Sequence, residues 1–285
     1  MQVALFRALE TARPRDRIFA DPLAVRFLPT GYRLAARLAR WRPAGTRLER
    51  YIDHRWPGPR ASAVARTRLI DDLVGAALAA APSAGPARQL VVLGAGYDSR
   101  AYRLPATADV RVFEVDHPAT QAAKQRLIRA AVRPDRRQHV RFVPVDLLRD
   151  DLGAALARAG FAARQPTVVI WEGVTNYLTA AAVDATLRGL AHRTATGSRI
   201  IFTYLDRAVL TGEIDTGAWA ASVRRQGEPW TFGFDPAALP GYLAERGLRR
   251  TLDLSTAEAA RRYLAPLGRL EPAATFYRVC QAEVA

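Results

Sequence analysis

A glycine-rich turn directly after an apolar run is the first feature of this sequence that could bind a ligand. Residues 89–93 read Gln-Leu-Val-Val-Leu, which is typical of a buried strand, and Gly94, Ala95 and Gly96 follow at once. Glycine allows a tight turn and leaves no side chain between the backbone and a ligand at the end of the strand. Several classes of nucleotide-binding protein have such a turn, and so do proteins without a ligand there.

The next predicted strand ends in an acid. Asp116 closes the run 111–116 and follows Gly94 at close to the spacing of about 20 residues at which an acid accepts hydrogen bonds from both hydroxyls of a ribose. The alternative is that Asp116 caps the helix expected to begin near Pro118, because Asp shortly before Pro often starts a helix.

Two further acids leave predicted strands. Asp146 follows the run 140–145 and could accept from the exocyclic amine of adenine, with Leu147 against the ring; capping a helix near residue 150 is the equal alternative. Glu172 follows the run 167–171 and could accept from an ammonium group, since a half-buried carboxylate needs a partner.

The turn favours a nucleoside over a dinucleotide. The dinucleotide fingerprint has a third glycine or alanine at the position that Ser99 occupies here, so no cradle for a pyrophosphate is expected. A nucleoside cofactor that would fit such a turn is S-adenosylmethionine. Its methionine part carries a carboxylate in addition to an ammonium group, and arginine is the natural bidentate partner of a carboxylate. Arg66, on the helix expected at 61–80, is the first candidate for that contact and Arg68 the second.

These residues need a parallel sheet to bring them together. Short apolar runs alternate with helical stretches, which predicts an α/β fold with a parallel sheet covered on both faces. The expected strands are 89–93, 110–115, 140–145, 167–171 and 198–204, with 248–254 and 275–283 pairing as the far edge. The expected helices are 2–12, 20–40, 61–80, 118–132, 150–159, 179–194, 207–226 and 235–246, and 41–60 is expected to be a loop.

The amino-acid composition limits the classes of binding partner that we expect. The 285 residues carry 42 basic and 27 acidic side chains, but Lys124 is the only lysine and the arginines are spread along the chain, so we expect no nucleic-acid partner. One cysteine, Cys280, excludes an intramolecular disulfide and a cysteine-cluster metal site. We find neither a signal peptide nor a run of about 18 apolar residues. We therefore expect a cytoplasmic protein with a small-molecule substrate and no membrane partner; the oligomeric state is not indicated.

Several motifs together resemble a known family. VLGAGYDSRAYRL, FEVDHP with Lys124 behind it, VPVDL and WEGVTNYL are similar to segments of the leucine carboxyl methyltransferase superfamily, in particular its bacterial branch related to the tetracenomycin carboxyl methyltransferase. FADPLAVRFL and ARTRLID upstream, and FTYLDRAVLTG, GEPWTFGFDP and RRYLAPLGR downstream, extend the resemblance over nearly the whole chain.

The resemblance implies a Rossmann-like class I methyltransferase with a mostly parallel seven-stranded sheet, helices on both faces and an added helical lid. Residues 1–85 would form the lid and the helix that holds the cofactor carboxylate, and 86–285 the core, with a lid insertion around 207–235. The cofactor would be S-adenosyl-L-methionine, leaving as S-adenosyl-L-homocysteine, with no metal. The implied cofactor-binding residues are Arg66, Gly94, Ala95, Gly96, Asp116, Asp146, Leu147 and Glu172.

The expected reaction is in-line attack of a substrate oxygen on the sulfonium methyl, with the enzyme acting by positioning. A carboxylate acceptor is already ionised at pH 7 and needs no base, whereas a hydroxyl does. The catalytic candidates are Tyr177, Tyr204 and His117, and the substrate-lining candidates are Arg7, Tyr177, Tyr204 and Trp230, each with core packing or a structural contact as the alternative. His54, His139 and His192 are further possible bases.

The expected function is therefore O-methylation of a small molecule, at a carboxylate or hydroxyl of a secondary metabolite. Two alternatives stay open: a cofactor-binding relative that catalyses another reaction, such as a cyclisation, and an NAD-dependent oxidoreductase. The N-terminal segment and the segment RYLAPLGRLEP depart from many relatives, so the acceptor itself is left open.

Overall fold

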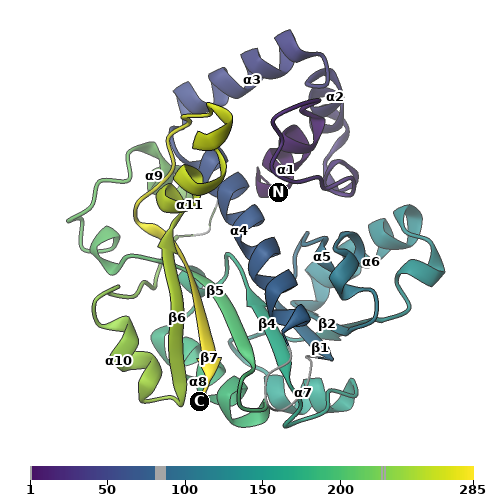
Figure 1. Ribbon diagram of the computed structural model, residues 1–285, viewed down its shortest axis with the longest axis vertical. Coiled ribbons are helices and arrows are strands. Elements are labelled where there is room, and N and C mark those ends of the chain that lie inside the picture. The colour runs from purple at the N-terminus through teal and green to yellow at the C-terminus, as the bar shows by residue number, and fades with distance from the viewer. Residues whose placement is uncertain (1, 81–87, 226, 228) are drawn as a thin grey trace.

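The computed structural model describes residues 2–80, 88–225, 227 and 229–285, and its centre is a seven-stranded sheet in the order β3-β2-β1-β4-β5-β7-β6 (Figure 1). Neighbouring strands from β3 to β5 run parallel, and β7 is antiparallel to both β5 and β6. This confirms the predicted mostly parallel sheet. The strands are β1 (Gln89–Leu93), β2 (Arg111–Asp116), β3 (Val140–Pro144), β4 (Thr167–Trp171), β5 (Arg199–Leu205), β6 (Leu248–Ser255) and β7 (Tyr277–Val284).

The central strands are apolar throughout because both faces of the sheet are covered. Every residue of β1 is buried; Leu90 and Val92 belong to the core on one face, and Val91 and Leu93 to the core on the other. The helices following the glycine turn are α5 (Arg100–Arg103), α6 (Pro118–Ala131), α7 (Leu152–Arg158) and α8 (Ala180–Arg193).

The N-terminal part is helical, with α1 (Gln2–Ala12), α2 (Thr30–Leu38), α3 (Arg42–Arg55) and α4 (Pro59–Ala79). The prediction of a loop at 41–60 is wrong, because Pro43 stands in the first turn of α3, where its missing N–H costs no hydrogen bond. The predicted helix 20–40 is instead a 3₁₀ turn at Ala24–Phe27 followed by α2, and Leu28 between them is extended.

The C-terminal part also departs from the prediction. The expected helix 207–226 is a 3₁₀ turn (Arg207–Val209) followed by α9 (Ala218–Arg225), and α10 (Leu239–Ala244) begins after Asp235, whose carboxylate closes a turn by accepting from the Ala237 N–H. Helix α11 (Thr256–Tyr263) was not predicted. Its capping box, formed by Ser255 and Glu258, was the signal that could have revealed it.

The N-terminal helices share a core with the sheet. Leu9 of α1, Val64 and Ile70 of α4, and Leu90 of β1 belong to one apolar cluster. The proposed boundary at residue 85 lies outside the described residues. Among the described helices, none combines the length and the apolar character that a bilayer-spanning helix requires.

Candidate functional site

A pocket of about 730 Å³ opens at the carboxyl ends of β1 and β4. Parallel α/β sheets commonly place their ligand sites there, because the loops that follow neighbouring strands meet at one edge. The pocket wall combines the glycine turn with side chains from α1, α4, α9 and the start of β7. Its lining includes Phe6, Arg7, Pro59, Arg66, Gly94, Ala95, Gly96, Asp98, Glu172, Tyr177, Trp219, Trp230 and Tyr277.

The glycine turn is held by its own hydrogen bonds. The N–H of Ala95 donates to Val115 O at 3.0 Å, and the N–H of Gly96 donates to the carboxylate of Asp116 at 2.5 Å. Gly94 has a φ of +61°, and a Cβ there would also collide with the Val174 side chain. The positive φ and the close approach of Val174 therefore both favour glycine at this position, independently of any ligand against the backbone.

A buried network of charges forms the floor of the pocket. Glu172 Oε1 accepts from Arg66 Nε at 2.7 Å, and Glu172 Oε2 accepts from Arg100 Nη1 at 2.7 Å. Arg100 also donates to Asp98 and to Asp71 of α4. Two cations therefore hold one carboxylate, which lies at the pocket wall in a single orientation.

The network keeps its carboxylates ionised. Burial raises the pKa of Glu172, but the positive charges of Arg100 and Arg66 outweigh it and bring the value to about 2. Burial likewise raises the pKa of Asp98, and Arg100 and Lys124 more than reverse the effect. At neutral pH the pocket thus presents fixed negative groups beside Arg66.

Lys124 lies directly beneath the glycine turn. Its side chain is almost wholly buried, its ammonium is 2.8 Å from Glu114 Oε2, and it donates weakly to Ala95 O at 3.4 Å. Burial raises the pKa of Glu114 to about 6, although Lys124 acts in the opposite direction. This pair supports the turn from the core side.

Beside the charged floor, part of the pocket wall is aromatic. Trp219 stacks almost parallel on Tyr277 with ring centroids 5.9 Å apart, and meets Trp230 edge-on at 5.9 Å. The Arg66 guanidinium lies 4.8 Å from the centroid of the Tyr277 ring, so Tyr277 joins the charged floor to the aromatic wall. Tyr177, on the turn Thr175–Tyr177, also lines the pocket.

The structure brings together most of the sequence-predicted cofactor residues. Arg66, the three residues of the glycine turn and Glu172 line the pocket, and so do the substrate candidates Arg7, Tyr177 and Trp230. Arg66 lies on α4 as predicted, whereas Arg68, the second candidate, is paired with Asp72 nearer the surface.

Asp116, Asp146 and Leu147 are not among the pocket-lining residues. Asp116 adjoins the site through Gly96, and both its oxygens also retain lone pairs for a further donor. The Asp146 carboxylate closes a turn by accepting from the Leu148 N–H at 3.0 Å, and Leu147 lines a separate cavity of about 200 Å³ beside α7 and α8. Asp146 therefore holds a turn, and the helix cap that was its expected alternative role is provided by Asp151 instead.

Tyr204 does not reach the pocket, which corrects its placement beside the substrate. The residue is fully buried in the core, and its hydroxyl donates to Asp253 Oδ2 at 2.7 Å. The side chain of a tyrosine at the end of a strand can point into the core or toward a ligand. Here the hydrogen bond to Asp253 on β6 holds Tyr204 in the core.

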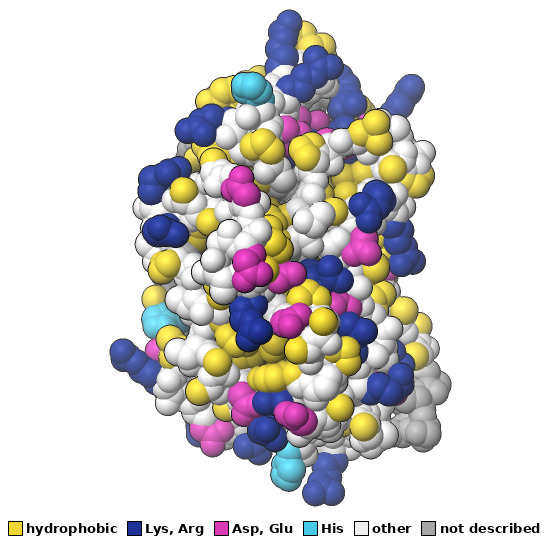
Figure 2. All heavy atoms as spheres, turned by 90° about the vertical axis from the view of Figure 1, so that its left-hand side faces the viewer, with side chains coloured by type: hydrophobic (Ala, Val, Ile, Leu, Met, Phe, Trp, Pro, Cys, Tyr) yellow, Lys and Arg dark blue, Asp and Glu magenta, His cyan; other side chains and the backbone are white. Residues whose placement is uncertain are grey.

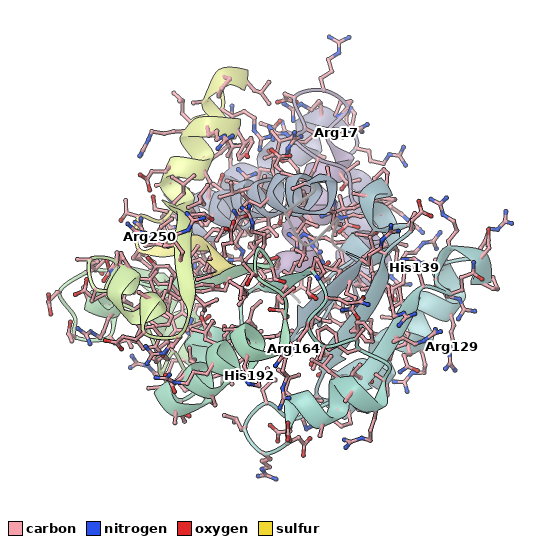
Figure 3. All side chains as sticks on the ribbon, turned by 60° about the horizontal axis from the view of Figure 1, so that its bottom comes forward. Arg17, Arg129, His139, Arg164, His192 and Arg250 are labelled. Atoms are coloured by element: carbon pink, nitrogen blue, oxygen red, sulfur yellow. The ribbon has the colours of Figure 1, made fainter. Side chains whose placement is uncertain are left out.

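The histidines lie away from the pocket lining. His117 is exposed and caps α6 by accepting from the Ala119 N–H through Nδ1. His139 contacts Ala101 O at 2.8 Å and lies far from His192 of α8, as Figure 3 shows. His54 is exposed on α3. No histidine lines the pocket among the described residues.

Sequence reasoning missed Asp98, Arg100, Trp219 and Tyr277. Asp98 and Arg100 follow the glycine turn directly, and that adjacency was a usable signal. Trp219 and Tyr277 are far apart in the chain, and no local pattern marks them as neighbours.

Known proteins resemble this chain in sequence and in fold. A sequence profile of the leucine carboxyl methyltransferase family matches residues 1–191. A protein of Frankia alni named "Putative S-adenosyl-L-methionine-dependent methyltransferase" is 39% identical over 208 residues, covering 73% of this chain and 68% of its own. One of the same name from Streptomyces coelicolor is 34% identical over 263 residues, covering 89% and 87%.

The solved structures agree on the fold. A methyltransferase from Thermobifida fusca, described as putative, has a TM-score of 0.57 at 18% identity and covers 85% of this chain and 88% of its own. A DUF574 family protein from Streptomyces avermitilis has a TM-score of 0.55 at 15% identity, covering 85% and 91%. With the sequence matches above, the seven-stranded sheet and the pocket at its carboxyl edge place this chain in the leucine carboxyl methyltransferase family.

Proposed function

We propose that this protein transfers a methyl group from S-adenosylmethionine to an oxygen of a small aromatic molecule, a carboxylate or a hydroxyl. The observation that carries the proposal is one pocket that combines a charged floor, Arg66 beside Glu172, with an adjoining aromatic wall, Trp219 with Trp230 and Tyr277. The family membership and the relatives named above support the same cofactor.

The charged floor fits the amino-acid end of the cofactor. Arg66 uses its Nε for Glu172, and its two terminal nitrogens remain suited to a carboxylate. Glu172 is ionised at neutral pH and keeps lone pairs for an ammonium group. When bound, S-adenosylmethionine supplies an electrophilic methyl group on its sulfonium.

The aromatic wall fits a flat acceptor. Trp219, Trp230 and Tyr277 offer apolar surface against which a flat ring can pack. The chain's own groups would thus orient the acceptor oxygen. A carboxylate acceptor needs no proton transfer, which suits a pocket lined by no histidine among the described residues.

The structure disfavours the NAD alternative. A pyrophosphate is bound by free backbone N–H groups in the glycine turn, but those of Ala95, Gly96 and Asp98 already donate to Val115, Asp116 and Ala95. A cofactor-binding protein that catalyses a non-methylating reaction would use the same charged pocket floor. It differs from a methyltransferase only in that the methyl group stays on the cofactor.

The proposal is tested by calorimetry followed by methyl transfer. S-adenosylhomocysteine should bind and NAD should not. With methyl-labelled cofactor, the label should enter 2-naphthoate or 2-naphthol and not their fully hydrogenated analogues, which have the same carbon skeleton without the flat ring. Alkali releases the label from a methyl ester and not from a methyl ether, so the same product distinguishes a carboxylate from a hydroxyl acceptor.

Two controls isolate the parts of the proposal. Trp219→Leu should abolish the preference for the aromatic acceptor and leave calorimetric binding of S-adenosylhomocysteine unchanged. Binding of NAD in place of the nucleoside would contradict the cofactor assignment. Label retained on the cofactor with every acceptor, despite tight binding, would favour the non-methylating alternative.

A further inference from the structure

Helices α2 and α3 form a hairpin that carries large apolar side chains in solvent. Leu34 and Leu38 are each 57% exposed, and Trp41, the N-cap residue of α3, is 65% exposed. Leu34 and Leu38 lie one turn apart on one face of α2, whereas Ala36 is buried on the opposite face. We call Leu34, Leu38 and Trp41 the apolar ridge.

Arginines surround the ridge, and the nearby carboxylates are already paired. Exposed arginines of the hairpin are Arg37, Arg40, Arg42, Arg47, Arg50 and Arg55. The only two carboxylates between residues 30 and 55 are Glu49, which is 2.8 Å from Arg13, and Asp53, which is hydrogen-bonded to Arg60 at 2.9 Å. Among these arginines, only Arg42 lies within 4 Å of an acid in the described part of the chain, at 3.4 Å from Asp16. The hairpin therefore presents apolar and positive groups together.

The figures show the same combination. Figure 1 places α2 and α3 at the top of the molecule, and at that level Figure 2 shows dark blue side chains projecting from the surface beside yellow ones. The sequence does not predict this face, because the prolines and glycines of 41–60 resemble a loop and the clustering of the arginines arises only in the fold.

The combination of apolar and positive side chains on the hairpin fits some kinds of binding partner better than others. A two-fold contact between copies would bring Arg37 and Arg40 toward their own equivalents, which costs free energy through like-charge repulsion. Nucleic acid would satisfy the arginines and leave the ridge without an apolar partner. An anionic bilayer surface satisfies both, because leucine and tryptophan enter the interface while arginines reach the headgroup phosphates.

We propose that the α2–α3 hairpin docks this protein on the surface of an anionic lipid bilayer, which replaces the expectation from the sequence that it has no membrane partner. Helix α3 runs on to α4, whose residues Pro59 and Ala63 line the pocket, so the docking element is joined to the pocket wall. The proposal does not depend on the identity of the cofactor or of the reaction.

The test is flotation of the whole protein with vesicles. Vesicles of phosphatidylcholine containing about one third phosphatidylglycerol should bind the protein about tenfold or more tightly than phosphatidylcholine alone, and added salt should weaken the binding. Leu38→Gln and Trp41→Ser should each reduce binding several-fold. The matched control is Leu148→Gln, because Leu148 is also 57% exposed but lies in the loop between β3 and α7; it should bind like the unaltered protein.

A second arm tests the charges. Arg37→Gln with Arg40→Gln should reduce binding to anionic vesicles, while Arg133→Gln, at an arginine 83% exposed beside the turn Pro134–Arg136, should not. All these side chains are exposed, and circular dichroism would verify that the variants fold.

Three results would overturn the proposal: equal binding to both vesicle types, equal loss in Leu38→Gln and Leu148→Gln, or no vesicle binding at all. In the last case, self-association abolished by Leu38→Gln would assign the face to a second copy of the chain. Binding to duplex DNA that is insensitive to Leu38→Gln would assign it to nucleic acid.

Discussion

Arg100 Nη1 lies 2.7 Å from Glu172 Oε2, and this ion pair joins the segment after the glycine turn to the end of β4. The same guanidinium contacts Asp98 and Asp71, so one arginine that is 1% exposed organises three carboxylates, one from α4 and two from the loops after β1 and β4. The pocket floor is thus assembled by the protein itself, and a ligand meets charges that are already oriented.

Replacing Arg100 should destabilise the fold strongly. Arg100→Met leaves buried carboxylates without their cation, and we expect a loss of about 3–5 kcal/mol in the free energy of unfolding, measured with urea. The control is Arg188→Met, which breaks an exposed pair with Asp184 on α8 and should cost less than about 1 kcal/mol. Equal losses of unfolding free energy in Arg100→Met and Arg188→Met would show that the buried network stabilises the fold no more than an exposed ion pair does.

Glu172 should stabilise the protein only when ionised. Its pKa is lowered to about 2 in the folded state from an ordinary value of 4.5, so its contribution is fully present above pH 4.5 and is lost as the pH falls toward 2. The stability difference between the unaltered protein and Glu172→Gln, up to about 3 kcal/mol, should be constant from pH 8 to pH 5 and shrink below. A difference that grows on acidification would contradict the ion-pair assignment.

The NMR signal of Lys124 should report the ionisation of Glu114. Since Lys124 is the only lysine, labelling lysine Cε with ¹³C gives one side-chain resonance by NMR. Because burial raises the pKa of Glu114 to about 6, that resonance should titrate near pH 6, and the inflection should vanish in Glu114→Gln. A flat profile between pH 5 and pH 7 in the unaltered protein would mean that Glu114 does not change its charge there.

Asp116→Ala should weaken S-adenosylmethionine binding by about tenfold or more in calorimetry, because ribose hydroxyls lose their acceptor and the Gly96 N–H loses its partner. Asp109→Ala, at an exposed acid just before the other end of β2, should leave the affinity unchanged. Unchanged affinity in Asp116→Ala would remove Asp116 from the proposed cofactor site.

Tyr204→Phe should affect stability and not turnover. The substitution removes the hydrogen bond to Asp253 and should cost about 1–3 kcal/mol in urea unfolding, while kcat and KM for the methyl acceptor stay as they were. A fall in kcat at unchanged stability would return Tyr204 to the list of catalytic candidates.

Much of the sheet and part of the site could be predicted from local pattern. Apolar runs ending in glycine or acid marked β1, β2 and β4, and because parallel strands end at one edge, Gly94 and Glu172 were expected to meet there, as they do. The same reasoning did not place Asp146, whose carboxylate accepts a hydrogen bond from the backbone of its own turn instead of lining the pocket. A short sequence pattern does not distinguish a ligand contact from such a local hydrogen bond.

Tertiary structure alone decided which distant side chains became partners. Trp219 and Tyr277 stack although 57 residues of chain separate them, Arg100 meets Asp71 across a helix interface, and the α2–α3 hairpin exposes its ridge because Ala36 and Ala39 face inward. The hydrophobic periodicity of a segment states which of its faces is buried, but it carries no information about which other segment covers that face. Pairing of that kind is selected only when the whole core packs, so the charged floor, the aromatic wall and the exposed hairpin are properties of the fold.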